Sequence, residues 1–593
     1  MPPMIQRLIV STDLGTIHCF SANTSMANQQ APSKYANMPS PLSKPSKYTE
    51  IVNQIISDTS ITKGFCLIVG IDGGQLAYEI ATRSDLRVIG IDQDTQEIRK
   101  ARMALAKAGI YGTHVSIQKV AGNKLPFTDY FANIVLINDQ QFETEIDRVL
   151  RPCGGVTYRI LSDGASRIRE RGRLPNSGEW THQYADLGSS ACSRDQHVND
   201  NLTIQWFGNP GPRRMIDRHL RTVPPLFSYG RLFIPGNDRV IAVDGYNGTE
   251  LWDRQIANSL RVAIPYDTSY MAADQNRLYV ATGEKCLIIS AQVGQDYSVF
   301  SISELIGRSD RHWGYVAVAD DMLFGSAQKI TASRTEQSYE AIVDHYKDDR
   351  PLVVSDHLFA VDLANNHLAW QYHQGIIPNS TITIGEGKVF FFESRNPKAI
   401  NNRVGRVTAK NLLNQDASLV AIEARTGNRL WEQPFTLPPL RHSLYLSYAT
   451  DTLIAVGSIN KNDQTWYQVH AWNGNDGALL WTANHRNSRP GIGGDHGEQV
   501  LHPAIVGNIV ITEPAAYDLR TGKQLNPSGK DSDWTMPVRS GCRTITASST
   551  CIFYRDSNPT MMDFGTNSPS KKITQVSRPG CWLNIIPAGG LVF

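Results

Sequence analysis

A ten-residue motif that ends in tryptophan recurs through the second half of the chain, and it constrains the fold more than any other feature. An acidic or amide residue is followed by Gly or Asn four positions later and by Trp eight positions later. The copies read VDGYNGTELW, VDLANNHLAW, IEARTGNRLW and WNGNDGALLW, with a degenerate copy, YDLRTGKQLN. Apolar, strand-like segments such as GKVFFFES precede them. A repeated four-stranded unit with one aromatic residue per unit is the sequence signature of a β-propeller.

The motif has a physical interpretation as a hairpin turn. Its first side chain caps the turn, its glycine takes the positive-φ position, and its tryptophan packs between neighbouring sheets. The positions in chain order are Asp244, Gly248 and Trp252; Asp362, Asn366 and Trp370; Glu423, Gly427 and Trp431; Asn473, Gly477 and Trp481; and Asp518, Gly522 and Asn526. We expect a propeller of about seven or eight blades over residues 178–593.

The length and charge of the chain bound its other possibilities. With 593 residues it is too long for one ordinary domain. Its net charge of +2 gives no electrostatic case for a nucleic-acid partner. No run is long and apolar enough to form a transmembrane segment. The eight cysteines include no CxxC pair, so a zinc ribbon or thioredoxin-like site is unsupported.

Residues 48–165 show another pattern, in which helical and strand-like segments alternate. Helices are expected over 48–59, 75–83, 95–108 and 142–150, and strands over 66–69, 87–91, 115–119 and 134–137, with one more after RPCGG. Such alternation predicts an α/β, Rossmann-like domain with a doubly wound parallel sheet. Ligands bind sheets of this kind at the carboxyl ends of the strands.

One stretch of this domain, FCLIVGIDGGQLAYEIA, combines a buried strand, a glycine turn and the start of a helix. Gly70, Asp72, Gly73 and Gly74 form the turn, and Asp92 ends the next strand. Backbone N–H groups at a helix N-terminus favour a carboxylate or a phosphate. An acid at the tip of the next parallel strand can accept hydrogen bonds from both hydroxyls of a ribose. These residues predict a site for an adenosine-containing cofactor.

Four segments of residues 48–165 occur in order along the chain: LIVGIDGGQLA, VIGID, LPFTDYFANIVLIND and EIDRVLRPCGGV. On these segments the domain resembles class I S-adenosylmethionine-dependent methyltransferases. The resemblance implies S-adenosylmethionine as cofactor. It also places Asn138, after the fourth strand, where such enzymes touch the acceptor or the cofactor; a solvated loop is the alternative. An NAD site is less well supported, because the full G-x-G-x-x-G is absent.

The resemblance has three departures. Ile68 replaces the leading acid of the cofactor loop, Asp72 replaces its middle glycine, and Ala121 stands where an acid commonly contacts the adenine amine. The competing interpretation is a retained fold that binds no cofactor. No catalytic residue is assigned, because a bound sulfonium is already an activated methyl donor and the enzyme mainly aligns the acceptor.

The propeller half resembles the pyrroloquinoline-quinone (PQQ)-like, quinoprotein alcohol dehydrogenase-like repeat family, which includes bacterial assembly-factor propellers. WTHQYADLGSSACS, HWGYVAVADDMLFGSAQK, GGDHGEQ, RPGCW and NIIPAGGLV are similar to a bacterial, planctomycete-type family of propellers that carry the same methyltransferase-like insertion. Enzymes that oxidise alcohols with PQQ typically use an adjacent Cys–Cys pair and a Ca²⁺ held by carboxylates and an amide. This chain has no Cys–Cys pair, so PQQ is not expected as a cofactor.

Two further groups of residues are candidate sites. Gly491–His502 contains Asp495, His496, Glu498 and His502, which could bind a metal. Their spacing matches no specific metal motif, so a hydrogen-bonded loop is favoured and no metal site is assigned. Cys542 and Cys581 each follow a glycine and could pair in an oxidising compartment. Cys66 and Cys153 are expected to be inert core thiols.

The two ends of the chain suggest how the halves are joined. Residues 1–22 include a strand, a turn and a strand, which are expected to complete a propeller blade together with Gly590–Phe593. Residues 23–47 are a polar linker, and the α/β domain is then an insertion near the N-terminus. The start lacks the features of a signal peptide, and both ends fall within apparent strands, which indicates a piece of a longer chain.

These observations predict an S-adenosylmethionine-dependent methyltransferase fused to a propeller that binds a protein or small-molecule partner. The alternative is a non-catalytic propeller that binds or assembles partners in the bacterial envelope and carries a degenerate methyltransferase fold. A quinone-dependent dehydrogenase ranks third. An active methyltransferase implies the cytoplasm, where its cofactor is made, and the alternative implies the envelope or periplasm.

Overall fold

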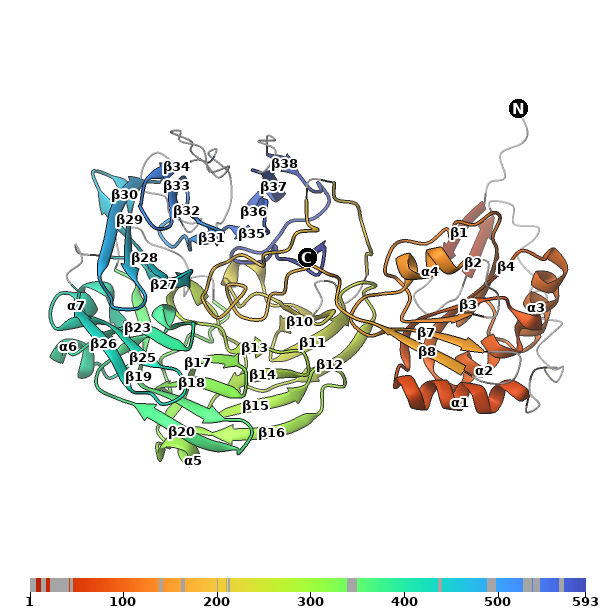
Figure 1. Cartoon of the computed structure of the whole chain (residues 1–593), viewed down its shortest axis with the longest axis horizontal. Coiled ribbons are helices and arrows are strands. Elements are labelled where there is room, and N and C mark those ends of the chain that lie inside the picture. The colour runs from red at the N-terminus through yellow and green to blue at the C-terminus, as the bar shows by residue number, and fades with distance from the viewer. Residues whose placement is uncertain are drawn as a thin grey trace. The chain divides into compact units, whose positions relative to one another are not determined.

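The computed structural model divides into two compact units, Met1–Gly172 and Arg173–Phe593, which we call unit 1 and unit 2 and describe separately (Figure 1). The structure describes residues 7–11, 17–21, 42, 46–137, 142–160, 166–199, 201–208, 211, 214–338, 349–435, 440–487, 498–525, 536, 544–564 and 570–593. Among the helices of these residues, none combines the length and the apolarity needed to cross a bilayer.

Unit 1 is built on a six-stranded sheet with the order β5-β4-β3-β6-β7-β8. The strands are β3 (Lys63–Val69), β4 (Asp85–Asp92), β5 (Val115–Lys119), β6 (Ile134–Ile137), β7 (Gly155–Ile160) and β8 (Ser166–Arg171). The first five in this order are parallel, and β8 runs antiparallel to β7. The chain reverses its direction of winding between β3 and β6, which is where doubly wound sheets bind ligands.

Helices cover both faces of this sheet. They are α1 (Lys47–Thr59), α2 (Gln75–Arg83), α3 (Thr95–Lys107) and α4 (Glu143–Val149). Cys66 and Ile68 of β3 belong to the core beneath α1, α2 and α3, whereas Leu67 and Val69 belong to the core beneath α4. This alternation follows from the two-residue period of a strand. The predicted helices and strands of this region are therefore found within a few residues of their expected bounds.

A separate hairpin precedes this sheet. Strands β1 (Arg7–Ser11) and β2 (Ile17–Ser21) pair with each other and, among the described residues, with no other strand. This differs from the expectation that the hairpin completes a propeller blade. Among the described residues, the sheets of unit 2 take all their strands from Leu226 onward, so the hairpin contributes to none of them.

The described residues of unit 2 form seven consecutive antiparallel sheets, each with a four-stranded path, which makes it a seven-bladed propeller. The first three blades are β9 (Leu226–Ser228), β10 (Arg231–Gly236), β11 (Arg239–Asp244) and β12 (Glu250–Gln255); β13 (Met271–Ala273), β14 (Arg277–Thr282), β15 (Lys285–Ser290) and β16 (Asp296–Ser301); and β17 (Arg311–Ala319), β18 (Met322–Lys329), β19 (Pro351–Asp362) and β20 (His367–Tyr372). Strands β21 (Ile377–Pro378) and β24 (Arg406–Thr408) also pair with β19.

The remaining four blades come next in chain order. They are β22 (Thr383–Gly385), β23 (Lys388–Ser394), β25 (Ala417–Glu423) and β26 (Arg429–Pro434); β27 (Leu444–Ala449), β28 (Thr452–Lys461), β29 (Gln464–Asn473) and β30 (Leu479–Arg486); β31 (Ala504–Val506), β32 (Ile509–Thr512), β33 (Ala515–Asp518) and β34 (Gln524–Leu525); and β35 (Thr546–Ala547), β36 (Cys551–Asp556), β37 (Asn558–Asp563) and β38 (Lys571–Lys572). Short helices α5 (Ile302–Ile306), α6 (Pro397–Ile400) and α7 (Ala409–Leu413) and a terminal hairpin, β39 (Pro587–Ala588) and β40 (Leu591–Val592), complete the unit.

In the four repeats that have it, the tryptophan joins one blade to the next, as the motif predicts. The Nε1–H of Trp370 donates to the carbonyl of Ala424 at 2.9 Å, and the indole lies over Gly427 of the next turn. A Cβ on Gly427, whose φ is +71°, would come within 2.7 Å of the ring. The same arrangement joins Trp252 to Gly294, Trp431 to Gly477 and Trp481 to Gly522. The glycine is therefore needed both for its backbone conformation and for the indole above it.

The ring is closed by a segment that the repeat does not contain. Trp206, which precedes the first blade, donates Nε1–H to the carbonyl of Gly245 at 2.8 Å and lies over Gly248. It takes the place of the docking tryptophan that the last blade lacks. Asp195 joins the two ends of unit 2, because its Oδ2 accepts the N–H groups of Gly178 and Gly590, both at 2.8 Å.

Trp180–Ala191, which we call the central segment, binds the edge strand of every blade in turn. Its backbone carbonyls accept N–H groups from the first, second, fourth, fifth, sixth and seventh blades, and the Nε2 of His182 accepts the N–H of Val318 from the third. The donors to the carbonyls are Phe227, Ala273, Ile384, Tyr448, Ile505 and Ala547. Seven edge strands therefore converge on one short stretch of chain, and the central segment lies among them.

Candidate functional site

The glycine turn of unit 1 adopts the left-handed conformations that its sequence predicts. After β3, the φ angles are +85° at Gly70, +66° at Gly73 and +88° at Gly74, and Asp72 also has a positive φ, +37°. Gly74 is needed for close packing as well, because a Cβ there would lie 3.2 Å from the Cβ of Ala101 on α3. The turn therefore brings the N-terminus of α2 against the carboxyl end of β3.

Asp92 connects this turn to the tip of β4. Its Oδ2 accepts the N–H of Ile71 at 3.2 Å, and its Oδ1 accepts the N–H of Asp94 at 2.9 Å. The N–H of Gly70 also donates to the carbonyl of Ile91 at 3.0 Å. Asp92 is only partly buried, and each carboxylate oxygen can accept more than one hydrogen bond. Both oxygens thus remain able to accept a hydroxyl of a ligand.

Asp72 turns its carboxylate towards α1. It accepts a hydrogen bond from the hydroxyl of Tyr48, and Lys47 lies 3.4 Å from its Oδ2. The Tyr48 hydroxyl bond, assisted by the Lys47 charge, holds the pKa of Asp72 below its usual range. The side chain that replaces the expected middle glycine is therefore held by α1. The sequence pattern shows nothing that links Lys47 and Tyr48 to this turn, because it indicates only an amphipathic helix.

The loop after β5 lies against the same edge of the sheet. The N–H of Val120 donates to the carbonyl of Asp92 at 3.0 Å, and Nε2 of Gln93 donates to the carbonyl of Gly122 at 3.2 Å. Ala121, between them, offers no side-chain hydrogen bond to an adenine. Gly70, Asp72, Gly73, Gly74 and Asp92 are thus brought to one edge of the sheet, whereas Asn138, the sixth predicted site residue, lies outside the described residues.

The other candidate residues of the sequence do not assemble into a site. Asp495, His496 and Cys542 lie outside the described residues. Glu498 and His502 are buried, and the ring of His502 stacks on that of Tyr184 at 3.5 Å. Burial lowers the pKa of His502 to about 3. Within the described part of the chain, no group of three or more potential metal ligands occurs.

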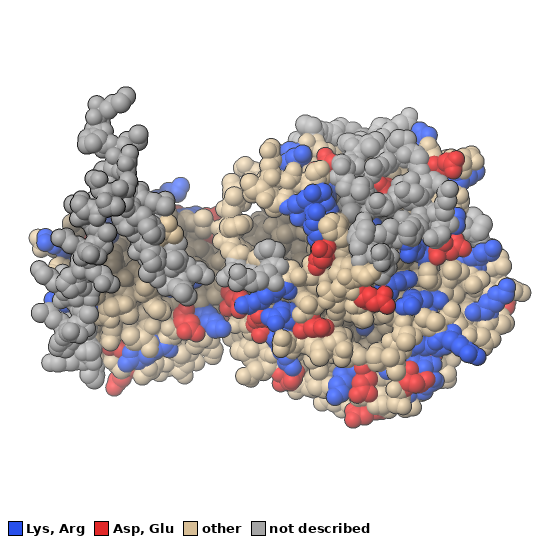
Figure 2. Space-filling model, turned by 180° about the vertical axis from the view of Figure 1, so that it is seen from behind, with Lys and Arg blue, Asp and Glu red and all other residues tan. Residues whose placement is uncertain are grey.

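The surface charge agrees with the near-neutral sequence. Figure 2 shows Lys and Arg interspersed with Asp and Glu over the described part of the visible face of unit 2. The cysteines expected to be inert are buried: Cys66 is fully inaccessible and Cys153 is 4% exposed. Burial raises the pKa of the Cys66 thiol well above its usual range.

A family model described as the outer membrane protein assembly factor BamB matches residues 415–557. This match covers the end of the fourth blade, the fifth and sixth blades and part of the seventh. Unit 2 is thus a β-propeller, and residues 415–557 within it are similar to this family. A search of the curated proteins gives no match.

Solved structures resemble each half of the chain. The quinohemoprotein alcohol dehydrogenase of Comamonas testosteroni is 10% identical over 70% of this chain and 75% of its own, with a TM-score of 0.41. Hsv2p of Kluyveromyces lactis is 7% identical over 61% of this chain and 98% of its own, with a TM-score of 0.34.

Methyltransferases match a much shorter part of the chain. A protein of Methanococcus maripaludis, assigned to the S-adenosyl-L-methionine-dependent methyltransferases, is 24% identical over 19% of this chain, with a TM-score of 0.18. An S-adenosylmethionine-dependent methyltransferase of Aquifex aeolicus is 19% identical over 20% of this chain, with a TM-score of 0.17. The chain spans 54% and 66% of the lengths of these two proteins.

Proposed function

We propose that unit 1 binds S-adenosylmethionine and transfers its methyl group, and that the propeller binds the partner that presents the acceptor. The observation that carries this proposal is the position of Asp92, whose partly exposed carboxylate lies at the tip of β4 and accepts the N–H of Ile71 from the glycine turn. An acid at this place in a doubly wound sheet can bind the two hydroxyls of a ribose.

The residues of the turn fit the cofactor in most respects. Asp92 would accept hydrogen bonds from the ribose, and the N–H groups at the start of α2 would favour the carboxylate of the methionine moiety. Asp72 need not obstruct the site, because Tyr48 and Lys47 hold its carboxylate towards α1. Ala121 would leave the adenine amine without a carboxylate partner, which predicts weaker binding than in methyltransferases that have the acid. When bound, the cofactor supplies an activated methyl group, and the chain has to align the acceptor and exclude water.

Isothermal titration of S-adenosylmethionine into the whole chain tests this proposal. We expect binding in the wild-type protein and a loss of affinity of at least about tenfold in Asp92→Ala, because a charge-assisted hydrogen bond is removed. Asp85→Ala is the matched control, since Asp85 begins the same strand and is exposed. The proposal fails if no heat is detected at millimolar cofactor, or if both variants bind equally well.

A second function is favoured by the family match over residues 415–557. In this alternative the chain is a non-catalytic propeller that binds or assembles protein partners in the bacterial envelope, and unit 1 keeps the fold without the cofactor. Failure of the titration would favour this alternative, and attention would move to the partners that the propeller retains. The compartment separates the two functions further, since S-adenosylmethionine is a cytosolic metabolite.

Quinone-dependent oxidation receives less support from the geometry. The central segment hydrogen-bonds to the edge strands of all seven blades, so it occupies part of the space that a cofactor at the propeller axis would need. The sequence has no Cys–Cys pair to lie against a quinone. We therefore assign no step to PQQ.

A further inference from the structure

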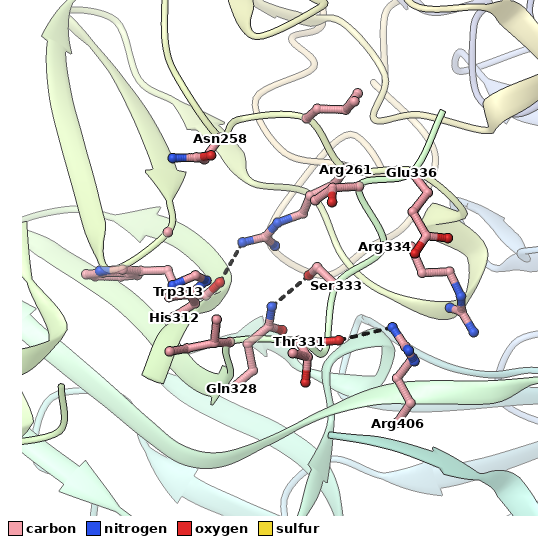
Figure 3. Close-up of a pocket in the computed structure, with 14 residues that line it drawn as sticks. Asn258, Arg261, His312, Trp313, Gln328, Thr331, Ser333, Arg334, Glu336 and Arg406 are labelled. Carbon is pink, nitrogen blue, oxygen red and sulfur yellow. Dashed lines mark hydrogen bonds between the residues drawn. The ribbon is translucent and has the colours of Figure 1, made fainter. Parts of the chain in front are cut away.

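Unit 2 contains a cavity of about 480 Å³ beside its third blade, and arginine side chains dominate its charge (Figure 3). Arg261 comes from the linker after β12, Arg334 from the segment after β18, and Arg406 from β24. Cavities of roughly 300–1,000 Å³ are typical of small-molecule sites. The cavity lies within unit 2 and shares no residue with the proposed cofactor site, so a ligand here is independent of the function proposed for unit 1.

Backbone carbonyls, and no carboxylate, position two of these arginines. Arg261 is buried and donates from Nη1 to the carbonyl of Gly314 at 2.6 Å and from Nη2 to that of Trp313 at 2.5 Å. Arg406 donates from Nη1 to the carbonyls of Thr331 and Ala332, at 3.0 and 3.2 Å. Neutral acceptors fix these guanidinium groups in place but do not neutralise their charge.

The third arginine has an unused donor. Nη1 of Arg334 is buried and has no hydrogen-bond partner in the described residues. Nε and Nη2 of the nearby Arg350 are likewise buried and without a hydrogen-bond partner there. Nε1 of Trp313, which also lines the cavity, is buried without an acceptor among those residues. Burial and, after it, the neighbouring charge of Arg406 hold the pKa of Arg334 below its usual range. Buried donors without acceptors are costly, and their presence calls for an explanation.

The carboxylates near the cavity do not balance this charge. Asp267 is buried behind the wall and accepts the hydroxyl of Ser333 at 2.6 Å, and Glu336 lines the cavity. Among the lining residues, one carboxylate thus stands against three guanidinium groups, and none of these three forms an ion pair within the part of the chain that the structure describes. An anion that enters the cavity would relieve this excess.

We propose that this cavity binds a hydroxylated organic anion, with its phosphate or carboxylate held by Arg334 and Arg406 and approached by Arg261. The planar guanidinium fork suits both kinds of oxyanion. The rest of the lining carries amide and hydroxyl groups, on Gln328 and Ser333 among others, which can bond to the hydroxyls of such a ligand. A bare inorganic ion would leave most of the volume unfilled.

Calorimetric titration of the whole chain with four probes tests this proposal. Glucose 6-phosphate and glucuronate carry the two possible anionic groups on a hydroxylated body, glucose lacks the charge, and inorganic phosphate lacks the body. We expect at least one of the two sugar anions to bind at submillimolar concentration, more tightly than phosphate, and glucose not to bind. The better of the two sugar anions identifies the group that the arginines recognise.

Two variants connect this binding to the cavity. Arg334→Gln and Arg406→Gln should each lower the affinity for the sugar anion by at least about tenfold, because each removes a charge-assisted hydrogen bond to the anion. Arg520→Gln, an exposed arginine of the sixth blade, should bind as the wild type does. Arg334→Gln should also melt close to the wild type without ligand, because it removes a buried donor that has no acceptor along with one long hydrogen bond, from Nη2 to the carbonyl of Pro351 at 3.4 Å.

Three results would overturn the proposal. The first is no heat from either sugar anion at about 10 mM, which corresponds to no useful affinity. The second is equal binding by Arg334→Gln and the wild type. The third is failure of Arg334→Gln to fold, since it would show that this arginine supports the propeller and has no spare donor for a ligand.

Discussion

At the scale of single residues, the repeat glycines have two separable roles, in backbone conformation and in packing. Gly427 has a φ of +71° and lies under Trp370, whereas Gly387 in the same blade has a φ of +73° and nothing within 4 Å of an added Cβ. The pair therefore separates the cost of left-handed backbone from the cost of displacing an indole.

We expect Gly427→Ala to destabilise unit 2 more than Gly387→Ala does. Both variants should lose about 1 kcal/mol from the positive φ, and Gly427→Ala should lose roughly 1–3 kcal/mol more from overpacking against Trp370. Denaturant unfolding followed by tryptophan fluorescence measures the difference. Equal losses in the two variants would show that the indole is not docked on the glycine.

The sequence predicts this contact but not every instance of it. The motif Trp and Gly lie at fixed spacings, so their pairing across blades follows from the repeat. Trp206 makes the same contact with Gly248, but it lies outside any copy of the motif, and no local signal marks it. In the candidate site, Asp92 and the glycines could be predicted because they follow from one strand–turn–helix pattern. The contact between Tyr48 and Asp72 could not, because it depends on how α1 packs.

At the scale of elements, the inner edge strands that bind the central segment should be among the most protected parts of unit 2. The amides of Ile384, Tyr448 and Ile505 donate to the carbonyls of that segment at 2.9, 2.7 and 2.8 Å. Hydrogen exchange measured by mass spectrometry should show them exchanging at least about tenfold more slowly than the outer edge of β16, since exchange there needs less of the fold to open. Comparable rates at both edges would contradict this placement of the segment.

Burial of histidines around the central segment makes the stability of unit 2 depend on pH. Burial lowers the pKa of His182 to about 4 and that of His502 to about 3. The unfolded chain binds these protons near pH 6.5 while the folded chain does not. Above pH 6.5 these two histidines therefore do not reduce the free energy of unfolding. That free energy falls as the pH drops from 6.5 towards the pKa values of the two histidines in the folded protein.

His502→Phe tests this sign directly. Each such histidine should lower the free energy of unfolding by about 1.4 kcal/mol per pH unit below pH 6.5. The variant keeps an aromatic ring beside Tyr184 but cannot titrate, so its slope between pH 6 and 5 should be smaller than that of the wild type by about this amount. Identical slopes would show that His502 is protonated in the folded protein. The comparison cancels the carboxylates, which are the same in both proteins.

At the scale of the whole molecule, the closure of the propeller rests on Asp195. Its buried carboxylate accepts the N–H groups of Gly178, Gly590, His197 and Val198 at 2.8–3.0 Å, and so joins the start of unit 2 to its end. The expected closure by the N-terminal hairpin missed this arrangement, because Gly590 reaches Asp195 only in the finished ring, whereas His197 and Val198 are its neighbours in the sequence.

Asp195→Asn should lower the free energy of unfolding of unit 2 by on the order of 3 kcal/mol. The substitution replaces one carboxylate oxygen with an NH2 group, so the backbone N–H groups that donated to that oxygen lose their acceptor. Asp476→Asn, at an exposed turn with one backbone partner, should change the free energy of unfolding by less than about 1 kcal/mol. Thermal unfolding of the two variants gives the comparison. A similar melting temperature for both would rule out closure through Asp195.

The arginine-lined cavity also belongs to this scale. Arg261, Arg334 and Arg406 lie far apart in the sequence, and a backbone bridge between Val262 and Arg334 brings the first two segments together. No local motif marks these arginines, and only the packing of the second and third blades brings them to one cavity. The fold could thus be predicted from repeats, whereas this candidate site could not.

A crystal structure of the whole chain with S-adenosylhomocysteine tests the central claim most directly. We expect the ligand over the glycine turn, with its ribose hydroxyls within hydrogen-bond distance of the Asp92 carboxylate. A crystal grown at saturating ligand in which this edge of the sheet is empty, or in which the ligand lies elsewhere, would contradict a working cofactor site in unit 1.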